Sequence, residues 1–397
     1  MRKTGEPTVS PEQQGVGGHI EAAIVPKQDA RPNDPRRNDP RPHDPRPNDP
    51  RPHDPRPHDP RPTSFDIAYL AGVSQPTVSR ALSGSPMVSE GTRKRIEAIA
   101  RQLNYKVDKN ASSLRKRRSD TLALLFFEDP TADESLINPF FVAMLGSITR
   151  HAKHAGFDLL VSFQQLSDDW HVDYEDSHKA DGIILLGYGD YEAYRARLVA
   201  LEAQGTHFVR WGPVDPCQPG TTIGSDNVEG GRQAASHLIA LGRQRIAFLG
   251  HASGHYPEFH GRYRGVEQAL SAAGLASDAA LQMDAITTED AGAEAAHRLL
   301  DQGIGFDAIV AASDLIAIGA MRALAARGVS VPADVAIVGF DDIPAAGAST
   351  PPLTTVMQDT QRAGQYLVDA VVSQLLGKPS GSRILPTRLV VRKSCGS

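Results

Sequence analysis

Hydrophobic and polar positions after residue 120 alternate between short continuous apolar runs and amphipathic stretches. The apolar runs cover residues 121–127, 158–163, 181–187, 206–211, 245–250, 307–312, 334–340 and 387–392. The stretches between them carry apolar residues at helical spacing, and several end at a glycine, as at Gly156, Gly242 and Gly328. Continuous apolar strands separated by helices are typical of a parallel sheet that is covered on both faces.

The length of this alternating region predicts an α/β fold with two lobes. About 275 residues are more than one α/β unit comfortably holds. We expect lobe 1 to contain about residues 120–222 and 350–377, and lobe 2 about residues 223–349 and the C-terminal strand. Sheets of this kind bind ligands at the carboxyl ends of their strands, which makes the meeting place of the lobes the candidate ligand site.

A different pattern of short helices occupies residues 63–107. Two helices are predicted across a turn at Gly72, with Ser64 and Ser74 as their N-caps, and a third from Ser89 to about Asn104. Their predicted buried positions are Ile67, Leu70, Ala71, Val78, Ala81, Leu82, Ile96, Ile99, Ala100 and Leu103. Two short helices across a glycine turn form a helix-turn-helix, and the third gives them a surface to pack on.

Pro76 lies inside the second of these helices, although proline normally interrupts a helix. If Ser74 is the N-cap, Pro76 falls in the first turn, where backbone N–H groups have no intrahelical partner. The second helix of a helix-turn-helix lies in the DNA major groove, so we expect Gln75, Thr77 and Arg80 to point outward towards bases or phosphates. Pro76 can offer only apolar contact, for instance to a thymine methyl group. The alternative is a helix-turn-helix used for packing alone, which the basic linker that follows disfavours.

The linker, residues 108–119 (DKNASSLRKRRS), is too short and too polar to hold a helix alone. If it folds when two copies meet on DNA, Ala111 and Leu114 share one face. Leu114 can then act as a minor-groove wedge, with the basic residues from Arg115 to Arg118 near phosphates. The alternative is a solvated basic linker.

Residues 1–62 are predicted to be a disordered tail. From residue 31 the chain repeats a five-residue unit, RPNDP, RRNDP or RPHDP, without aliphatic residues. Each proline removes a backbone donor and disfavours helix, so this stretch cannot build a core. The alternatives are a metal site through His43, His53 and His58, or a DNA-tethering arm through the arginines. The isolated histidines disfavour the first and the interleaved aspartates the second.

Composition limits the partners further. The net charge of -5 over 397 residues means that any nucleic-acid contact comes from a local basic region. No run approaches eighteen consecutive apolar residues and the N-terminus has no apolar stretch typical of a secretory signal, so we expect a cytoplasmic protein without a membrane partner. Cys217 and Cys395 lie far apart without a CxxC pair, so we expect two reduced thiols, no metal site and no cofactor.

The stretch DIAYLAGVSQPTVSRALSGSPMVSEGTRKRIEAIARQLNY resembles the DNA-binding headpiece of the lactose/galactose-repressor (LacI/GalR) family. The segments NPFF, DGIILL, GGRQAASHLIALGRQRIAFLG, RYRGVEQAL, SDLIAIGAM, VAIVGFDDI and PPLTTV then follow in that family's order. This resemblance covers about Ser64 to the C-terminus. It implies a periplasmic-binding-protein-like core that holds a small effector, a sugar or sugar derivative, between its lobes. The predicted DNA-contacting residues are Ser74, Gln75, Pro76, Thr77, Ser79, Arg80, Asn104, Tyr105, Ala111 and Leu114.

The resemblance also implies which residues contact the effector. Phe140 and Phe141 would stack on a ring or the apolar face of a sugar, Arg262 would make bidentate bonds to effector oxygens, and Asp314 would accept from effector hydroxyls. The alternatives are core packing for the two phenylalanines and a plain surface pair for Arg262 and Asp314. Arg210 stands where an aspartate is common in the family. If it faces the cleft together with Arg262, two cations favour an anionic effector, such as a sugar acid or sugar phosphate, over a neutral sugar.

The predicted function is a ligand-responsive transcriptional regulator, a repressor, that acts as a homodimer on a palindromic operator. Val107 and Asp108 stand where Pro-Asn is frequent in the family, which leaves the start of the hinge helix less fixed. The chain has no leucine heptads near its C-terminus, so a tetramer is not predicted. A periplasmic solute receptor would share the core but needs a signal peptide and has no use for residues 64–118. An enzyme is disfavoured because the chain has no GxSxG, Walker A, HExxH or nicotinamide GxGxxG motif.

Deletion of residues 1–62 tests whether the repeat tail takes part in DNA binding. If the tail is inert, operator affinity should stay within about threefold of the full chain, a difference of roughly 0.6 kcal/mol. Fluorescence anisotropy with both proteins on one operator duplex measures this. A larger loss would mean that the arginines of the repeat contribute to binding.

Overall fold

The computed structural model describes residues 62–105, 118–127, 137–164 and 169–397. The repeat tail with its three histidines lies outside these ranges, as do Ala111 and Leu114 of the linker. The alternatives stated above for those two segments therefore remain predictions.

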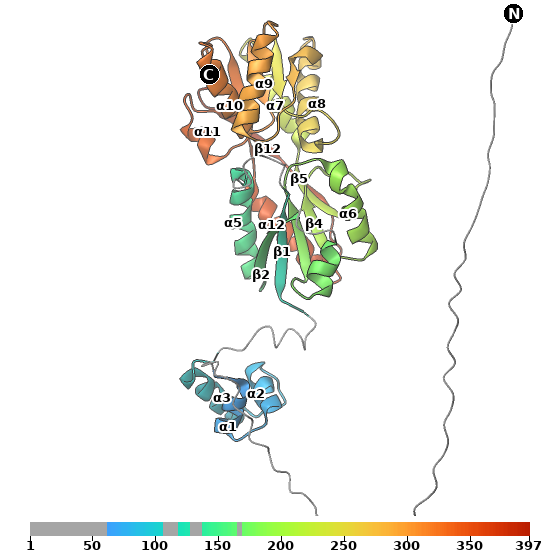
Figure 1. The fold of residues 1–397 in the computed structure, drawn as a ribbon, viewed down its shortest axis with the longest axis vertical. Coiled ribbons are helices and arrows are strands. Elements are labelled where there is room, and N and C mark those ends of the chain that lie inside the picture. The colour runs from blue at the N-terminus through green and yellow to red at the C-terminus, as the bar shows by residue number, and fades with distance from the viewer. Residues whose placement is uncertain (1–61, 106–117, 128–136, 165–168) are drawn as a thin grey trace, which may run out of the picture. The chain divides into compact units, whose positions relative to one another are not determined.

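The headpiece contains three short helices, α1 (Ser64–Ala71), α2 (Gln75–Leu82) and α3 (Glu90–Gln102) (Figure 1). The N-cap of α1 is Thr63 and not Ser64 as predicted, because Thr63 forms a reciprocal capping box with Asp66. The Thr63 backbone N–H donates to Asp66 Oδ2 at 2.7 Å, and the Asp66 N–H donates to Thr63 Oγ1 at 3.4 Å. Gly72 ends α1 at φ 62°, a left-handed conformation that favours glycine.

The core of the headpiece is small and rich in alanine. Its buried residues are Ile67, Ala68, Ala71, Val78, Ala81, Val88, Ile96 and Ala100. Leu70, predicted to be buried, is 56% exposed. The buried stripe of α1 runs instead through residues 67, 68 and 71, because the two small alanines allow α2 and α3 to approach this helix closely.

The first lobe is built on a six-stranded sheet with the order β11-β5-β4-β3-β1-β2. Its strands are β1 (Thr121–Phe126), β2 (Asp158–Phe163), β3 (Gly182–Leu186), β4 (Phe208–Trp211), β5 (Thr221–Ser225) and β11 (Arg383–Leu385), and all of them pair in parallel. Helices α5 (Pro139–His154), α6 (Tyr191–Ala203) and α12 (Thr360–Leu375) belong to this lobe, together with a π-helix, η2 (His171–Asp176).

The second lobe repeats this plan with the order β12-β10-β9-β8-β6-β7. Its strands are β6 (Ile246–Leu249), β7 (Gln282–Met283), β8 (Ala308–Ala311), β9 (Ala336–Asp341), β10 (Thr354–Gln358) and β12 (Thr387–Val390), of which only β12 pairs antiparallel. Its helices are α7 (Asn227–Ala240), α8 (Pro257–Ala272), η3 (Ala279–Leu281), α9 (Glu289–Asp301), α10 (Asp314–Ala326) and α11 (Pro344–Ala348).

The chain crosses between the lobes after β5, after β10 and between β11 and β12. The predicted lobe boundaries are therefore wrong at two places. Strand β5 extends lobe 1 to Ser225, and β10, which we expected in lobe 1, pairs with β9 and β12 of the second sheet. Neither segment is predicted as a strand from the sequence, because both are short and begin with two threonines in place of a continuous apolar run.

Glycines let the helices of the second lobe cross at short range. A Cβ added at Gly265 of α8 would lie 2.0 Å from the Val228 carbonyl oxygen of α7, and one at Gly231 of α7 would lie 2.0 Å from the Arg262 carbonyl oxygen. Helices α9 and α10 cross in the same way: a Cβ added at Gly292 of α9 would lie 2.3 Å from the Ile316 carbonyl oxygen, and one at Gly319 of α10 would lie 1.9 Å from the Glu289 carbonyl oxygen. Since backbone contacts backbone at these crossings, no larger residue fits without moving a helix.

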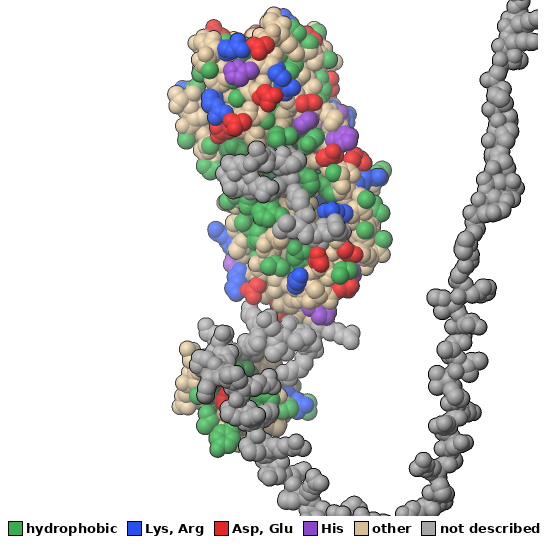
Figure 2. Space-filling model, viewed as in Figure 1, with side chains coloured by type: hydrophobic (Ala, Val, Ile, Leu, Met, Phe, Trp, Pro, Cys, Tyr) green, Lys and Arg blue, Asp and Glu red, His purple; other side chains and the backbone are tan. Residues whose placement is uncertain are grey.

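The exposed side of the second lobe carries charges of both signs. Figure 2 shows Lys and Arg side chains interspersed with Asp and Glu there, and Arg322 pairs with Asp290 at 2.7 Å. Among the described helices, none is long and apolar enough to cross a bilayer.

The substitution Gly265→Ala should lower the free energy of unfolding by about 1–3 kcal/mol, because the new methyl group meets backbone and not a movable side chain. Gly91→Ala in α3 is the matched control, since a Cβ there meets nothing within 4 Å and alanine is the better helix former. Urea denaturation of both variants measures the difference. Equal stability of the two would contradict the close crossing of α7 and α8.

Candidate functional site

The second helix of the headpiece begins as predicted. Ser74 is the N-cap of α2, and Pro76 lies in the first turn with its ring exposed. The proline therefore removes an N–H group that would have no intrahelical partner, and its fixed φ suits the first turn of a helix.

The side chains around Pro76 differ from the prediction, because two of them are engaged inside the headpiece. Gln75 is half-buried and its Nε2 donates to Ser64 Oγ of α1 at 3.2 Å. Thr77 is half-buried and its hydroxyl lies 2.9 Å from that of Ser74. Only Pro76 and Arg80 of the four are exposed. In the described headpiece the outward surface of α2 thus consists of one apolar ring and one guanidinium, while Gln75 links α2 to α1.

The remaining predicted DNA contacts lie at the edges of the headpiece. Ser79 is half-buried on α2. Asn104 follows α3 at φ 50° and is exposed. Tyr105 packs against the headpiece core, and its N–H donates to the Ala100 carbonyl oxygen at 2.8 Å. Tyr105 therefore also closes the small core at the end of α3.

A buried polar network joins the two lobes at the carboxyl ends of their strands. At its centre is Arg262 of α8, which is 0% exposed. Its Nε donates to Asn227 Oδ1 at 2.9 Å, its Nη1 donates to the Ala312 carbonyl oxygen, and its Nη2 donates to the Tyr188 hydroxyl of the first lobe at 2.9 Å. Asp341 of β9 lies 3.7 Å from Nη1 and supplies the opposite charge. The predicted alternative of a surface pair is wrong for Arg262.

Tyr188 is the contribution of the first lobe to this network. It follows β3, and its hydroxyl accepts from Arg262 and from Gln358 Nε2 at 2.8 Å, and donates to Asp341 Oδ1 at 3.2 Å. Burial raises the pKa of Tyr188, so the phenol keeps its proton and remains a donor. Gln358 Nε2 also donates to Asp341 Oδ1 at 2.7 Å.

Asp341 is held in an unusual environment. Burial raises its pKa to about 6 although Arg262 and the hydrogen bonds from Gln358 and Tyr188 oppose the shift. Its backbone has φ 111°, and that of the next residue, Asp342, has φ 58°. Non-glycine residues in such conformations cost free energy and cluster at functional sites. The strained turn at the end of β9 thus coincides with the polar network, since Asp341 belongs to both.

Asp314 lies outside this network. One carboxylate oxygen accepts from the Thr355 hydroxyl at 2.5 Å and the other from the Ile343 N–H at 2.9 Å, so both are engaged within the second lobe. Burial raises the pKa of Asp314, and the nearby Asp341 raises it further. The alternative of a surface location is wrong for Asp314, which is buried, and Asp341 is the carboxylate beside Arg262.

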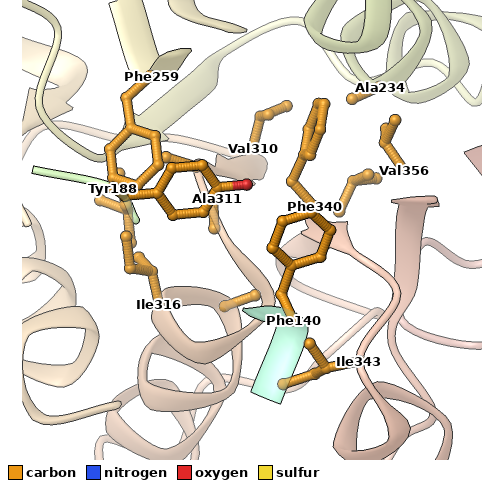
Figure 3. Close-up of a cluster of buried hydrophobic side chains, with 14 of the residues drawn as sticks. Phe140, Tyr188, Ala234, Phe259, Val310, Ala311, Ile316, Phe340, Ile343 and Val356 are labelled. Atoms are coloured by element: carbon orange, nitrogen blue, oxygen red, sulfur yellow. The ribbon is translucent and has the colours of Figure 1, made fainter. Parts of the chain in front are cut away.

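Phe140 and Phe141 begin α5 and are 1% and 3% exposed. Both contact Tyr188: the Phe140 ring is stacked on it at 5.9 Å between centroids, and the Phe141 ring meets it edge-on at 4.8 Å. Figure 3 shows Phe140, Tyr188, Phe259 and Phe340 gathered from both lobes. The phenylalanines are part of the buried core in this structure, and they also form the apolar wall beside the polar network.

Arg210 lies near the end of β4 and is 2% exposed. Its Nη2 donates to Gln218 Oε1, and its guanidinium lies 5.4 Å from the centroid of the Tyr191 ring. Glu258 of α8 is 5% exposed, and burial raises its pKa to about 7 against the opposing effects of Arg262 and Arg210. The structure thus brings both predicted arginines to the lobe junction, with Glu258 influenced by each of them.

Five residues of the junction were not predicted: Tyr188, Asn227, Glu258, Asp341 and Gln358. Each stands immediately after a strand, at the end of one, or in the first turn of a helix that follows one. The rule that ligands bind at carboxyl ends of strands could have directed attention to Tyr188 and Asp341. No local signal marks Gln358, because β10 was not recognised as a strand.

Glu258 should make stability depend on pH. Its pKa is about 7 in the folded chain against an ordinary value of 4.5, so the folded state keeps a proton that the unfolded chain loses. The resulting stabilisation is complete below pH 4.5 and is lost as the pH rises through 7, an effect of about 3 kcal/mol at most. Chemical denaturation between pH 5 and 8 should show a shallower loss of stability for Glu258→Gln than for the unaltered chain. Glu192→Gln, which alters an exposed glutamate, serves as the control. If the free energy of unfolding of Glu258→Gln changes with pH as steeply as that of the unaltered chain, the raised pKa of Glu258 is contradicted.

Comparison with known proteins matches both parts of the chain. Residues 65–108 match the family described as bacterial regulatory proteins, lacI family, and residues 235–395 match the periplasmic binding protein-like domain. The HTH-type transcriptional regulator CelR of Thermobifida fusca is 32% identical over 336 residues, which are 83% of this chain and 96% of that protein.

Solved structures agree with this assignment. A complex of CelR with cellobiose has a TM-score of 0.63 at 31% identity and covers 84% of this chain and 100% of its own. The lac repressor dimer bound to operator and the anti-inducer ONPF has a TM-score of 0.72 at 27% identity and covers 84% of this chain and 99% of its own. With its helix-turn-helix headpiece and two-lobed core, the chain belongs to the lacI family of bacterial transcriptional regulators.

Proposed function

We propose that this protein represses transcription by binding a two-fold symmetric operator as a homodimer, and that a small effector between its lobes changes its affinity for DNA. The observation that carries the proposal is the presence, in one chain, of a helix-turn-helix and of a core whose lobes are joined by buried, breakable polar contacts. Such a core can exist in two arrangements, and a ligand that prefers one of them shifts the population.

On DNA, α2 would lie in the major groove with its N-terminal turn against base edges. The exposed ring of Pro76 would contact a thymine methyl group, and Arg80 a guanine or a phosphate. Gln75 and Thr77 would reach bases only by giving up their contacts with Ser64 and Ser74. The DNA backbone would be contacted by Ser79, Asn104 and Tyr105. The minor groove would be contacted by Ala111 and Leu114 of the linker.

In the core, the effector would bind where Arg262, Asp341 and Tyr188 meet. Hydroxyl groups of a sugar can replace the hydrogen bonds that these residues make to one another, and the rings of Phe140 and Phe141 can cover an apolar sugar face. All five residues are buried with the lobes in contact, so binding requires the lobes to part and to close again on the ligand. The complex of CelR with cellobiose supports a sugar as the chemical class.

Two other functions are disfavoured. A solute receptor would use the same core, but the match of residues 65–108 to the lacI family gives the chain a DNA-binding module. An enzyme is disfavoured because the related proteins are transcriptional regulators. We therefore place the action of the protein on DNA in the cytoplasm, without a cofactor.

A footprint on DNA upstream of the protein's own gene, with and without candidate sugars, tests the proposed function. We expect protection of a palindromic site that weakens steeply with salt and changes when an effector is added. Absence of salt-sensitive binding to any palindromic site by the full-length protein would exclude a repressor.

The substitution Pro76→Gln should change which operator is preferred more than it changes stability, because it places a hydrogen-bonding side chain on the exposed surface of α2. We expect a selection from random DNA sites to return a different base opposite this position, with a melting temperature within a few degrees of the parent. The control is Ser83→Ala at the exposed end of α2, which should keep the parental site. An unchanged preference in Pro76→Gln would mean that α2 lies in the groove in another orientation.

A further inference from the structure

The two buried arginines at the lobe junction differ in how their charges are balanced. Arg262 has hydrogen-bond partners on all three nitrogens and a carboxylate, that of Asp341, at 3.7 Å. Arg210 is equally buried, but within the described ranges it has no carboxylate within 4 Å. Among the described residues, its side-chain hydrogen-bond partner is the neutral Gln218, and its Nε has no hydrogen-bond partner. A guanidinium cannot lose its proton, so the charge of Arg210 is buried without full compensation.

Arg210 faces the same junction as Arg262. The Arg210 guanidinium and the Glu258 carboxyl group both border Gly212, where an added Cβ would lie 2.8 Å from Arg210 Nη1 and 3.5 Å from Glu258 Oε1. Glu258 stands one helical turn before Arg262 on α8, so the two project from the same face of that helix. Arg210 of the first lobe therefore lies beside the polar network of the second.

The surroundings of Arg210 would leave its charge available to a ligand once the lobes part. Gly212 has no side chain to cover Nη1, and the aromatic face of Tyr191, 5.4 Å away, holds the guanidinium without neutralising it. An unpaired nitrogen on a planar, fixed guanidinium suits the two oxygens of a carboxylate or phosphate group.

We propose that the effector carries a negatively charged group, the carboxylate of a sugar acid or the phosphate of a sugar phosphate, and that Arg210 binds this group while Arg262 and Asp341 bind the hydroxyls. This inference rests on the proposed function, because it takes the lobe junction as the effector site. A neutral sugar would leave the Arg210 charge buried in the closed lobes without a carboxylate within 4 Å, whereas an anionic one supplies a close counter-ion. The charge of the ligand thus decides how well the lobes close.

Matched sugars that differ only in charge test this. Isothermal titration of the full-length protein would compare glucose with glucuronate and glucose 6-phosphate, galactose with galacturonate, and cellobiose alone. At least one anionic sugar should bind tenfold or more tightly than its neutral partner. The glucuronate and glucose 6-phosphate arms distinguish a carboxylate from a phosphate.

Arg210→Gln should weaken binding of that anionic sugar at least tenfold and change binding of the neutral partner less than twofold. Arg264→Gln, which removes an exposed arginine of α8, is the control for net charge and should change neither. If Arg210→Gln does not fold, as judged by circular dichroism, Arg210→Lys replaces it. Lysine keeps the positive charge but lacks the planar, two-pronged guanidinium. The anionic sugar should therefore still bind more tightly than the neutral one, by a smaller factor.

Three results would overturn the inference. The first is a neutral sugar that binds more tightly than every anionic one, and the second is an anionic sugar that binds the parent and Arg210→Gln equally well. The third is a loss in Arg210→Gln that is equal for anionic and neutral sugars, which would show that Arg210 only holds the lobes together. If operator binding persists and responds to a neutral sugar, the proposed function stands and this inference alone fails.

Discussion

The buried guanidinium of Arg262 is the constraint on which the arrangement of the core depends. It cannot be neutralised by losing a proton, and an unpaired charge in such a place would cost several kcal/mol. Its partners come from both lobes, Tyr188 from the first and Asn227, the Ala312 carbonyl and Asp341 from the second. A displacement of one lobe therefore breaks several contacts of this group at once. Such a junction favours a few discrete arrangements over a continuous range, which is the property a switch needs.

The attachment of the linker gives this junction a route to the DNA-binding module. Ser119 and Asp120, just before β1, are fixed by the Asp181 carboxylate, which accepts from their backbone N–H groups at 2.6 and 2.9 Å. The described residues that follow the linker are thus anchored to the first lobe, at the amino end of the sheet whose carboxyl end leads to Tyr188. Any rotation of the first lobe against the second moves this attachment point, and in a dimer it would change the separation of two such points.

The junction also departs from local structural rules in several ways at one place. Two successive aspartates have positive φ, the acids Asp341 and Glu258 are buried with raised pKa values, and the amide oxygen of Gln358 has no partner within the described part of the chain. Each feature costs stability. Several such departures at one place are typical of functional sites in proteins.

The sequence by itself determined the features that depend on neighbouring residues: the helix-turn-helix, the place of Pro76 in the first turn of α2, and the alternation of strands and helices that requires two lobes. These follow from caps, turns and periodicity, which act within a few residues. Only the tertiary structure decided that Arg262 meets Asp341 and not Asp314, that β10 joins the second sheet, and that Gln75 turns inward to α1. Those outcomes depend on which strands become neighbours and how closely the helices approach one another. Hydrophobic periodicity predicts that a residue is buried, but it does not predict which residues it contacts.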